Sequence, residues 1–147
     1  MKETIPIRWR WMKSMYAANI IWAGIPGFIV TFFPDKASQY MFFAPQDPLI
    51  FSMVGSIWLS IGILSAVALR YPLQFAGILG VQILYKSIWI IAVALPMIAR
   101  GDYRAAPFAF FFLLMVIGFA YAVPFDYFFG NKQNPKVDMR GAEVRTR

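Results

Sequence analysis

The chain has 147 residues, of which 60% are hydrophobic and only 14% are charged, and its formal net charge is +7. An average soluble domain carries about a quarter of its residues as charges, so this composition favours a protein whose solvent is lipid. The absence of Cys and His excludes disulfides and cysteine-ligated metals, and it removes the commonest general base. We therefore expect no metal, no cofactor and no catalytic residue, and the composition leans against an enzyme.

A basic and aromatic segment precedes the first apolar run. Basic and aromatic side chains alternate through Arg8, Trp9, Arg10 and Trp11, a pattern typical of a membrane-interface anchor that contacts phosphate headgroups. A protein-docking arm is the alternative. Because the Lys and Arg residues flank apolar runs and form no separate module, we expect the lipid bilayer as a partner and no nucleic acid.

Four apolar runs follow, and each is long enough to cross a hydrocarbon core about 30 Å thick as an α-helix. Their approximate bounds are 16–33, 51–69, 73–99 and 107–125. Pro26 lies inside the first run and predicts a kink there. Residues 34–50 hold three prolines among aromatic and charged residues, which predicts an interfacial connection or, alternatively, a lid over a ligand site.

These runs predict an all-α, polytopic membrane protein. A single four-helix transmembrane bundle would occupy residues 1–131, and a polar cytoplasmic tail would occupy 132–147. Four Lys and Arg residues precede the first run, Arg70 follows the second and five lie in the tail, ten in all, whereas three lie in the other connections. Because basic residues are enriched on the cytoplasmic side, both termini are expected in the cytoplasm. The expected location is a bacterial inner (plasma) membrane.

Lys86 lies at the midpoint of the third run. Insertion scales assign a central lysine a cost of about 2.5–3.5 kcal/mol, so we expect it to face the protein interior beside a partner. The nearest acidic candidate, Asp126, lies on the order of 13 Å from the middle of the fourth run, too far for a direct ion pair. Neutral groups on the same helix and on the second and fourth runs are the expected partners. The candidate ligand-binding or partner-docking residues are Lys86, Gln82, Tyr85, Trp89, Ser60 and Tyr121. The alternative is that Lys86 only fixes helix packing.

Small residues are spaced along the second and third runs. Gly55, Gly62, Gly77 and Gly80 are interpreted as positions where helices approach closely. The segment from Gly55 to Pro96, with its Gly-Ser start, its mid-helix Gly62 and an Arg-x-Pro boundary at Arg70, resembles helices two and three of the DoxX-like class of small four-helix membrane proteins. The resemblance implies the four-span layout and assigns no catalytic residue.

Three functions of different kinds fit these features. The leading hypothesis is an accessory or scaffold subunit of a membrane assembly, which would contact other membrane subunits or a second copy of itself. The alternative is a membrane carrier or binding protein for a small or lipophilic ligand that uses Gln82, Tyr85, Lys86 and Trp89. The third is a membrane enzyme that modifies a lipid or quinone. The sequence shows no conventional acid/base pair for such an enzyme.

Overall fold

The computed structural model describes residues 7–41 and 46–125, and within these ranges the chain is helical and contains no strand. Four continuous helical stretches are long and apolar enough to cross a membrane: Trp9–Phe32, Pro48–Ala68, Ala76–Ala99 and Tyr103–Ala122. The shortest has 20 residues, which at 1.5 Å per residue spans about 30 Å. The predicted all-α fold with four helices of spanning length is therefore confirmed. The predicted tail, 132–147, and Asp126 lie outside the described residues.

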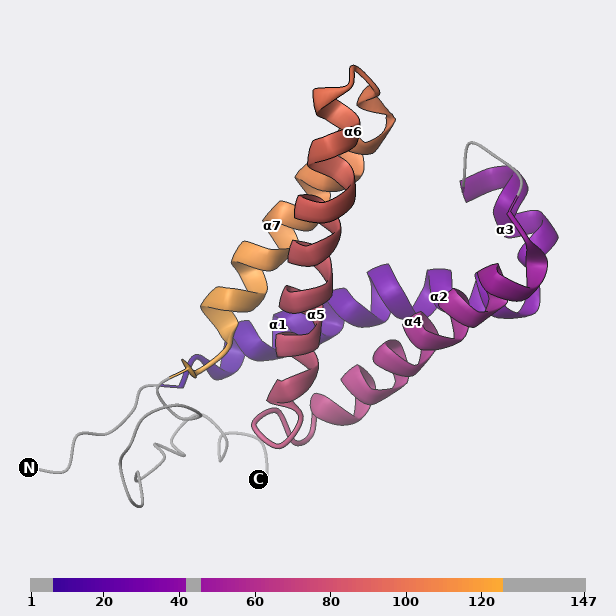
Figure 1. The fold of residues 1–147 in the computed structure, drawn as a ribbon. Helices are drawn as coiled ribbons and strands as arrows, with labels where there is room; N and C mark the ends of the chain where they lie inside the picture. Colours follow the sequence, from indigo (N-terminus) through magenta and orange to yellow (C-terminus); the bar gives the residue numbers. More distant parts are fainter. Residues whose placement is uncertain (1–6, 42–45, 126–147) are drawn as a thin grey trace, which may run out of the picture. The chain divides into compact units, whose positions relative to one another are not determined.

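Contacts divide the chain into two compact units, which are described separately. The first, here the α2–α4 unit, is Lys13–Ile78. The second, the α5–α7 unit, combines Met1–Met12 with Leu79–Arg147. The predicted single domain thus contains two clusters of internal contacts. Figure 1 labels the helices of both units.

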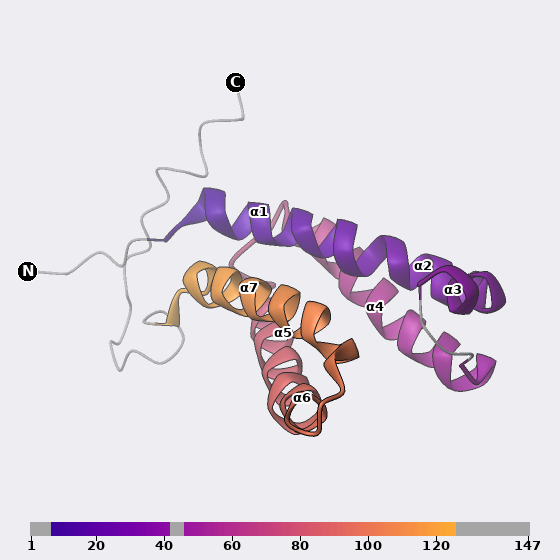
Figure 2. The ribbon, with the colours of Figure 1, turned by 90° about the horizontal axis from the view of Figure 1, so that it is seen from above.

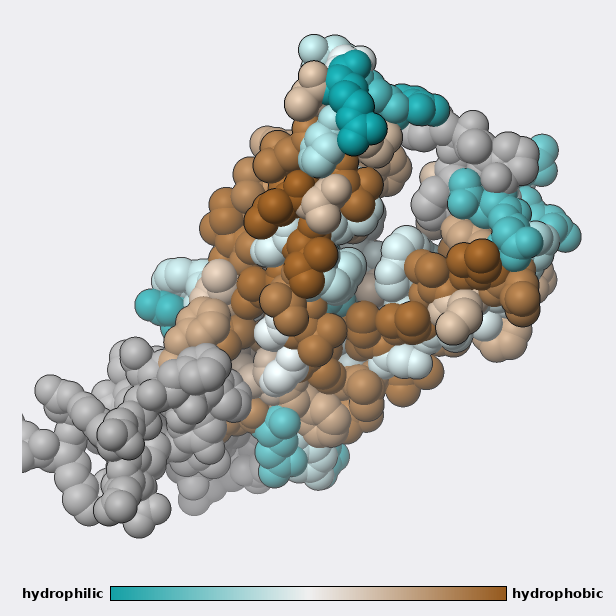
Figure 3. All heavy atoms as spheres, viewed as in Figure 1, coloured by the Kyte–Doolittle hydropathy of each residue, from teal (hydrophilic) through white to brown (hydrophobic). Residues whose placement is uncertain are grey.

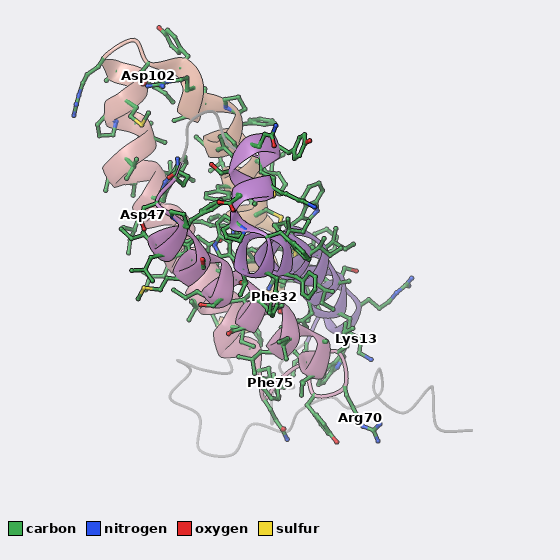
Figure 4. The ribbon with its side chains drawn as sticks, turned by 90° about the vertical axis from the view of Figure 1, so that its right-hand side faces the viewer. Lys13, Phe32, Asp47, Arg70, Phe75 and Asp102 are labelled. Carbon is green, nitrogen blue, oxygen red and sulfur yellow. The ribbon has the colours of Figure 1, made fainter. Side chains whose placement is uncertain are left out.

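The α2–α4 unit is built on a helical hairpin. Its first arm consists of α1 (Trp9–Asn19) from Lys13 onward, the π-helical segment η1 (Ile20–Gly24) and α2 (Ile25–Phe32). The short helix α3 (Pro34–Met41) and then α4 (Pro48–Ala68) follow. Asp47 caps α4, because its carboxylate accepts hydrogen bonds from the backbone N–H groups of Leu49 and Ile50 at 3.0 and 3.1 Å. Lys13 and Arg70 lie at one end of this hairpin and Asp47 at the other (Figure 4).

Two observed bounds differ from the sequence prediction. The first helix begins at Trp9, before the expected start near residue 16, because basic and aromatic residues at a membrane interface can still form helical backbone. The expected connection 34–50 contains α3, whose first residue is Pro34, a position where proline is compatible with a helix.

The α5–α7 unit contains the other two spanning helices. Its elements are α5 (Ala76–Trp89), the π-helical segment η2 (Ile90–Ala94), α6 (Leu95–Ala99), the 3₁₀ turn η3 (Tyr103–Ala105) and α7 (Ala106–Ala122). The turn after α6 uses Gly101 at a φ of 84°. Hydrogen bonds from Arg104 then lower the pKa of Asp102 to about 2, so this carboxylate stays ionised and caps the start of η3. Helix α7 runs back along α5 and α6 (Figures 1 and 2).

Each unit contains one long helix in which a π-helical segment precedes an internal proline. A π-helical segment of five residues ends two residues before Pro26 in one helix and two residues before Pro96 in the other. Proline lacks an N–H and clashes with the carbonyl four residues earlier, and the wider π turn accommodates both defects without ending the helix. The kink predicted at Pro26 therefore takes the form of a π turn.

Glycines bring the two arms of the α2–α4 unit into backbone contact. A Cβ atom added to Gly62 would overlap the backbone of Gly24, and one added to Gly27 would lie 2.8 Å from the carbonyl carbon of Trp58. A Cβ on Gly55 would lie 2.6 Å from a methyl group of Val30. The packing role predicted for Gly55 and Gly62 is thus confirmed.

The corresponding prediction for α5 is wrong. A Cβ added to Gly77 or Gly80 would meet nothing within 4 Å, so neither glycine is needed for a close contact in the described part of the chain. Spacing alone indicated a small-residue face on α5, but no atom of the described residues lies within 4 Å of a Cβ built on either glycine.

Buried polar groups also join the two arms of the α2–α4 unit. The amide of Asn19 donates to the Ser65 hydroxyl at 3.3 Å, and the Tyr16 hydroxyl donates to the Pro72 carbonyl at 2.7 Å. Asn19, Tyr16 and Ser65 are each at most 1% exposed. Inside a membrane such groups need partners from the protein itself.

The outward-facing side chains are largely apolar. At most 28% of the residues in any spanning window are buried within the chain, although these windows are the most hydrophobic parts of the sequence. The apolar colour covers the visible faces of the spanning helices, whereas hydrophilic residues gather at the turn between α6 and α7 and over α3 (Figure 3). This is the surface expected of helices whose surroundings are hydrocarbon.

Candidate functional site

Lys86 lies in the last turn of α5 and is only 4% exposed. Its ammonium group donates hydrogen bonds to the side-chain oxygen of Gln82, one helical turn earlier, and to the hydroxyl of Tyr85. Residues four apart lie on one face of a helix, which is why Gln82 and Lys86 meet without help from another element. We call Lys86, Gln82 and Tyr85 the Lys86 cluster.

Aromatic rings surround the ammonium group. Its nitrogen lies 4.2 Å from the ring centre of Tyr85, 4.9 Å from that of Phe112 and 5.6 Å from that of Phe119. Trp89 packs edge-on against Phe112, with the ring centres 5.2 Å apart. A desolvated cation over an aromatic face gains about 2 kcal/mol, so the rings of α7 compensate part of the cost of burying Lys86.

A carboxylate is absent from these contacts. No Asp or Glu in the described ranges pairs with Lys86, whose interactions are those with Gln82, Tyr85 and the three rings. Among the described residues, the protonated amine is therefore solvated by neutral groups alone. An ion in a site without a counter-charge attracts an anion more strongly than the same ion in water.

Gln82 adds an unpaired donor to the cluster. Its side chain is 0% exposed, and its amide nitrogen Nε2 has no hydrogen-bond partner among the described residues. Because an ammonium group can only donate, the amide must turn its oxygen towards Lys86, and this orientation leaves the NH₂ group unpaired. A buried unpaired donor costs about 1–3 kcal/mol, a cost that a bound acceptor would remove.

The structure brings four of the six predicted site residues together. Gln82, Tyr85 and Lys86 form the cluster, and Trp89 joins it through Phe112. Ser60 belongs to the α2–α4 unit, is exposed, and donates to the carbonyl of Ser56 in its own helix at 2.8 Å.

Tyr121 takes part in a different cluster, with two residues of the predicted interface anchor. The Arg8 guanidinium lies 4.0 Å from the Tyr121 ring centre and donates to the Tyr121 carbonyl at 3.0 Å. The Trp11 indole packs edge-on against the same ring at 5.4 Å and donates to the Gly118 carbonyl at 2.9 Å. The start of α1 is thereby attached to the last turns of α7, and Arg8 and Trp11 are both exposed, while their predicted contact with headgroups stays a prediction. Trp9 is half-buried and Arg10 is exposed on the same helix.

Sequence reasoning missed the rings that enclose Lys86. Phe112 and Phe119 are seven residues apart and therefore lie on one face of α7, but α7 contains so many Phe residues that this spacing does not stand out. It also missed the pair Asn19 and Ser65. Asn19 shares a helical face with Met12, Tyr16 and Ala23, and this spacing was a usable signal.

The groups of the site can bind a ligand through hydrogen bonds and charge. Within the part of the chain that the structure describes, no group of three or more His, Cys, Asp or Glu side chains could hold a metal ion. Comparisons with protein families, with characterised proteins and with solved structures find no match to this chain.

Proposed function

We propose that this multi-pass membrane protein binds a small or lipophilic molecule through the Lys86 cluster. The observation that carries the proposal is a buried lysine beside a buried amide nitrogen, where no described residue gives the lysine a carboxylate or the amide nitrogen a hydrogen-bond acceptor. Both groups are donors, they lie one turn apart, and a single ligand with acceptor atoms would satisfy both.

The buried lysine and the unpaired amide give less support to the other two hypotheses, an accessory subunit and a membrane enzyme. An accessory subunit is supported only if a neighbouring chain supplies the missing acceptor, and the apolar outer surface is equally suited to lipid. A membrane enzyme would need an acid/base pair, and the cluster contains an amine, an amide and a phenol.

The proposed setting is a bacterial inner membrane, with the four helices as one bundle and both termini in the cytoplasm. The excess of Lys and Arg before the first helix, after the second and in the tail supports this orientation. We also propose a topology similar to that of the DoxX-like class, because the chain has the same layout of four apolar helices.

Binding is tested with protein purified in mild detergent and incubated with total lipid extract of bacterial membranes. Native mass spectrometry should detect a bound molecule on the wild-type chain and lose it in Lys86→Met. Lys36→Met, which removes an exposed lysine of α3, is the matched control and should retain the ligand. Circular dichroism and gel filtration verify that each variant folds. Wild-type protein that carries no molecule beyond those held by folded Lys86→Met would refute the proposal.

The accessory-subunit hypothesis predicts a different result in the same preparations. A protein partner would purify with the wild type, and Lys86→Met would release it. Release of a protein chain without any Lys86-dependent small molecule would favour the subunit and reject the binding protein.

A further inference from the structure

The Lys86 cluster contains more donors than acceptors. An ammonium group carries three N–H bonds, and two of them are directed at the Gln82 oxygen and the Tyr85 hydroxyl. The Gln82 amide adds two N–H bonds that no described residue accepts. The surrounding groups are the rings of Phe112 and Phe119, which accept hydrogen bonds only weakly. A ligand for this cluster must therefore supply strong acceptor atoms.

The charge of the ligand follows from the charge of the cluster. In its protonated form Lys86 brings one positive charge, and within the described ranges no carboxylate pairs with it. One negative charge on the ligand would leave the buried complex neutral, whereas a phosphate monoester, with a charge close to −2, would leave an excess. A neutral Lys86 amine that meets a protonated acid gives the same neutral complex as an ammonium group that meets the acid's anion.

The position of Lys86 limits the size of the ligand's polar group. Lys86 lies ten residues after Ala76, about 15 Å along a helix of 24 residues, and is thus far from both ends. A phospholipid headgroup carries further polar or charged groups that would need partners at this depth, and the apolar rings around Lys86 offer none. A carboxylate is a compact anion with two acceptor oxygens.

Building on the proposed function, we propose that the ligand is a lipophilic monocarboxylic acid of the long-chain fatty-acid class. One carboxylate oxygen accepts from the Lys86 ammonium group and the other from the Gln82 amide nitrogen, which satisfies the unpaired donor. The hydrocarbon chain lies among apolar side chains and lipid. Trp89, three residues from Lys86, packs on the same Phe112 ring. Its fluorescence therefore reports whether the ligand's hydrocarbon chain lies beside it.

The test uses 9,10-dibromostearic acid, whose bromines quench tryptophan fluorescence on contact, with its methyl ester and the matching alcohol as neutral probes. All three have the same hydrocarbon chain and differ only in the head group, and the quenching that remains in Trp89→Phe measures the micelle partitioning of each. We expect the acid to quench at about tenfold lower concentration than the ester or the alcohol. In Trp89→Phe this difference should shrink, because the other tryptophans report only micelle partitioning.

Gln82→Glu is the most informative variant. It keeps the shape of the side chain and provides Lys86 with a carboxylate from its own helix, so the preference for the acid should disappear while the fold is retained. Lys86→Met should also lose the preference, and Lys36→Met should keep it. A preference that persists in both cluster variants would show attraction to basic surface residues and would overturn the inference.

Failure of this inference is distinct from failure of the proposed function. If the ester binds as tightly as the acid, while binding from lipid extract still depends on Lys86, the ligand is a neutral molecule and only the carboxylate assignment falls. If lipid extract gives no Lys86-dependent ligand, the proposed function itself falls and this inference with it.

Discussion

At the scale of single residues, several weak contacts together offset the free-energy cost of burying Lys86. Each ring that faces the ammonium group contributes through its negative face, and Gln82 and Tyr85 contribute oxygen atoms. Because these contacts share one cation, their energies are coupled and do not add.

A double-mutant cycle measures the coupling between Lys86 and Phe112. We expect Phe112→Leu to lower the free energy of unfolding by on the order of 0.5–2 kcal/mol, more than Phe110→Leu, whose ring is exposed. In a Lys86→Met background the extra loss should vanish, since no cation remains. Equilibrium unfolding of the purified protein in detergent provides the measurement, and equal losses in both backgrounds would contradict the cation–ring contact.

The buried pair Asn19 and Ser65 permits a second cycle. Polar side-chain pairs between membrane helices couple by about 0.6 kcal/mol on average and by about 1.7 kcal/mol at most. We expect Asn19→Ala and Ser65→Ala to show a coupling in this range, because each substitution leaves the other group without its partner. A coupling of zero, measured by the same unfolding experiment, would mean that the hydrogen bond contributes nothing in the membrane-like state.

Backbone contact between helices determines packing at the scale of elements. In the α2–α4 unit the two arms touch at Gly24 and Gly62, so no side chain separates the helices there. The π turn η1 ends at Gly24, which places the irregular backbone of one helix against the glycine of the other.

Gly62→Ala and Gly80→Ala make a matched pair of substitutions. The new methyl group on Gly62 would overlap the backbone of Gly24, so the arms must separate and stability should fall by about 1–3 kcal/mol. The methyl group on Gly80 meets no atom within 4 Å, and replacing a glycine inside a helix favours stability by up to about 1 kcal/mol. Opposite shifts in thermal unfolding temperature are therefore expected, and a loss of the same size for both would refute this account of the packing.

At the scale of the whole molecule, the described residues contain four helices of spanning length, and the proposed topology places successive connections on alternate sides of a membrane. Lys13 and Arg70 lie at the same end of the α2–α4 unit, as the proposed orientation requires (Figure 4). Asp47 and the N-terminus of α4 lie at the opposite end.

Single-cysteine labelling tests this orientation directly, because the chain contains no Cys of its own. A membrane-impermeant maleimide applied to intact cells should label Lys36→Cys and Arg104→Cys from outside. Arg70→Cys should be labelled only after the cells are opened. The reverse pattern would invert the topology, and labelling of all three in intact cells would contradict four spans.

The sequence alone was sufficient for the number of spanning helices and for the local part of the candidate site. Long uncharged runs must form helices in lipid, where every backbone N–H and C=O needs an internal partner. Gln82, Tyr85, Lys86 and Trp89 lie within two turns of one helix, so their proximity follows from the helical repeat.

Contacts between helices were decided only by the tertiary structure. Phe112 and Phe119 enclose Lys86, and Tyr121, which the sequence placed beside Lys86, packs instead on Arg8 and Trp11. Which residues of two helices meet depends on their relative rotation and axial register. These are set by side-chain packing over the whole contact, and residue spacing within one helix does not specify them.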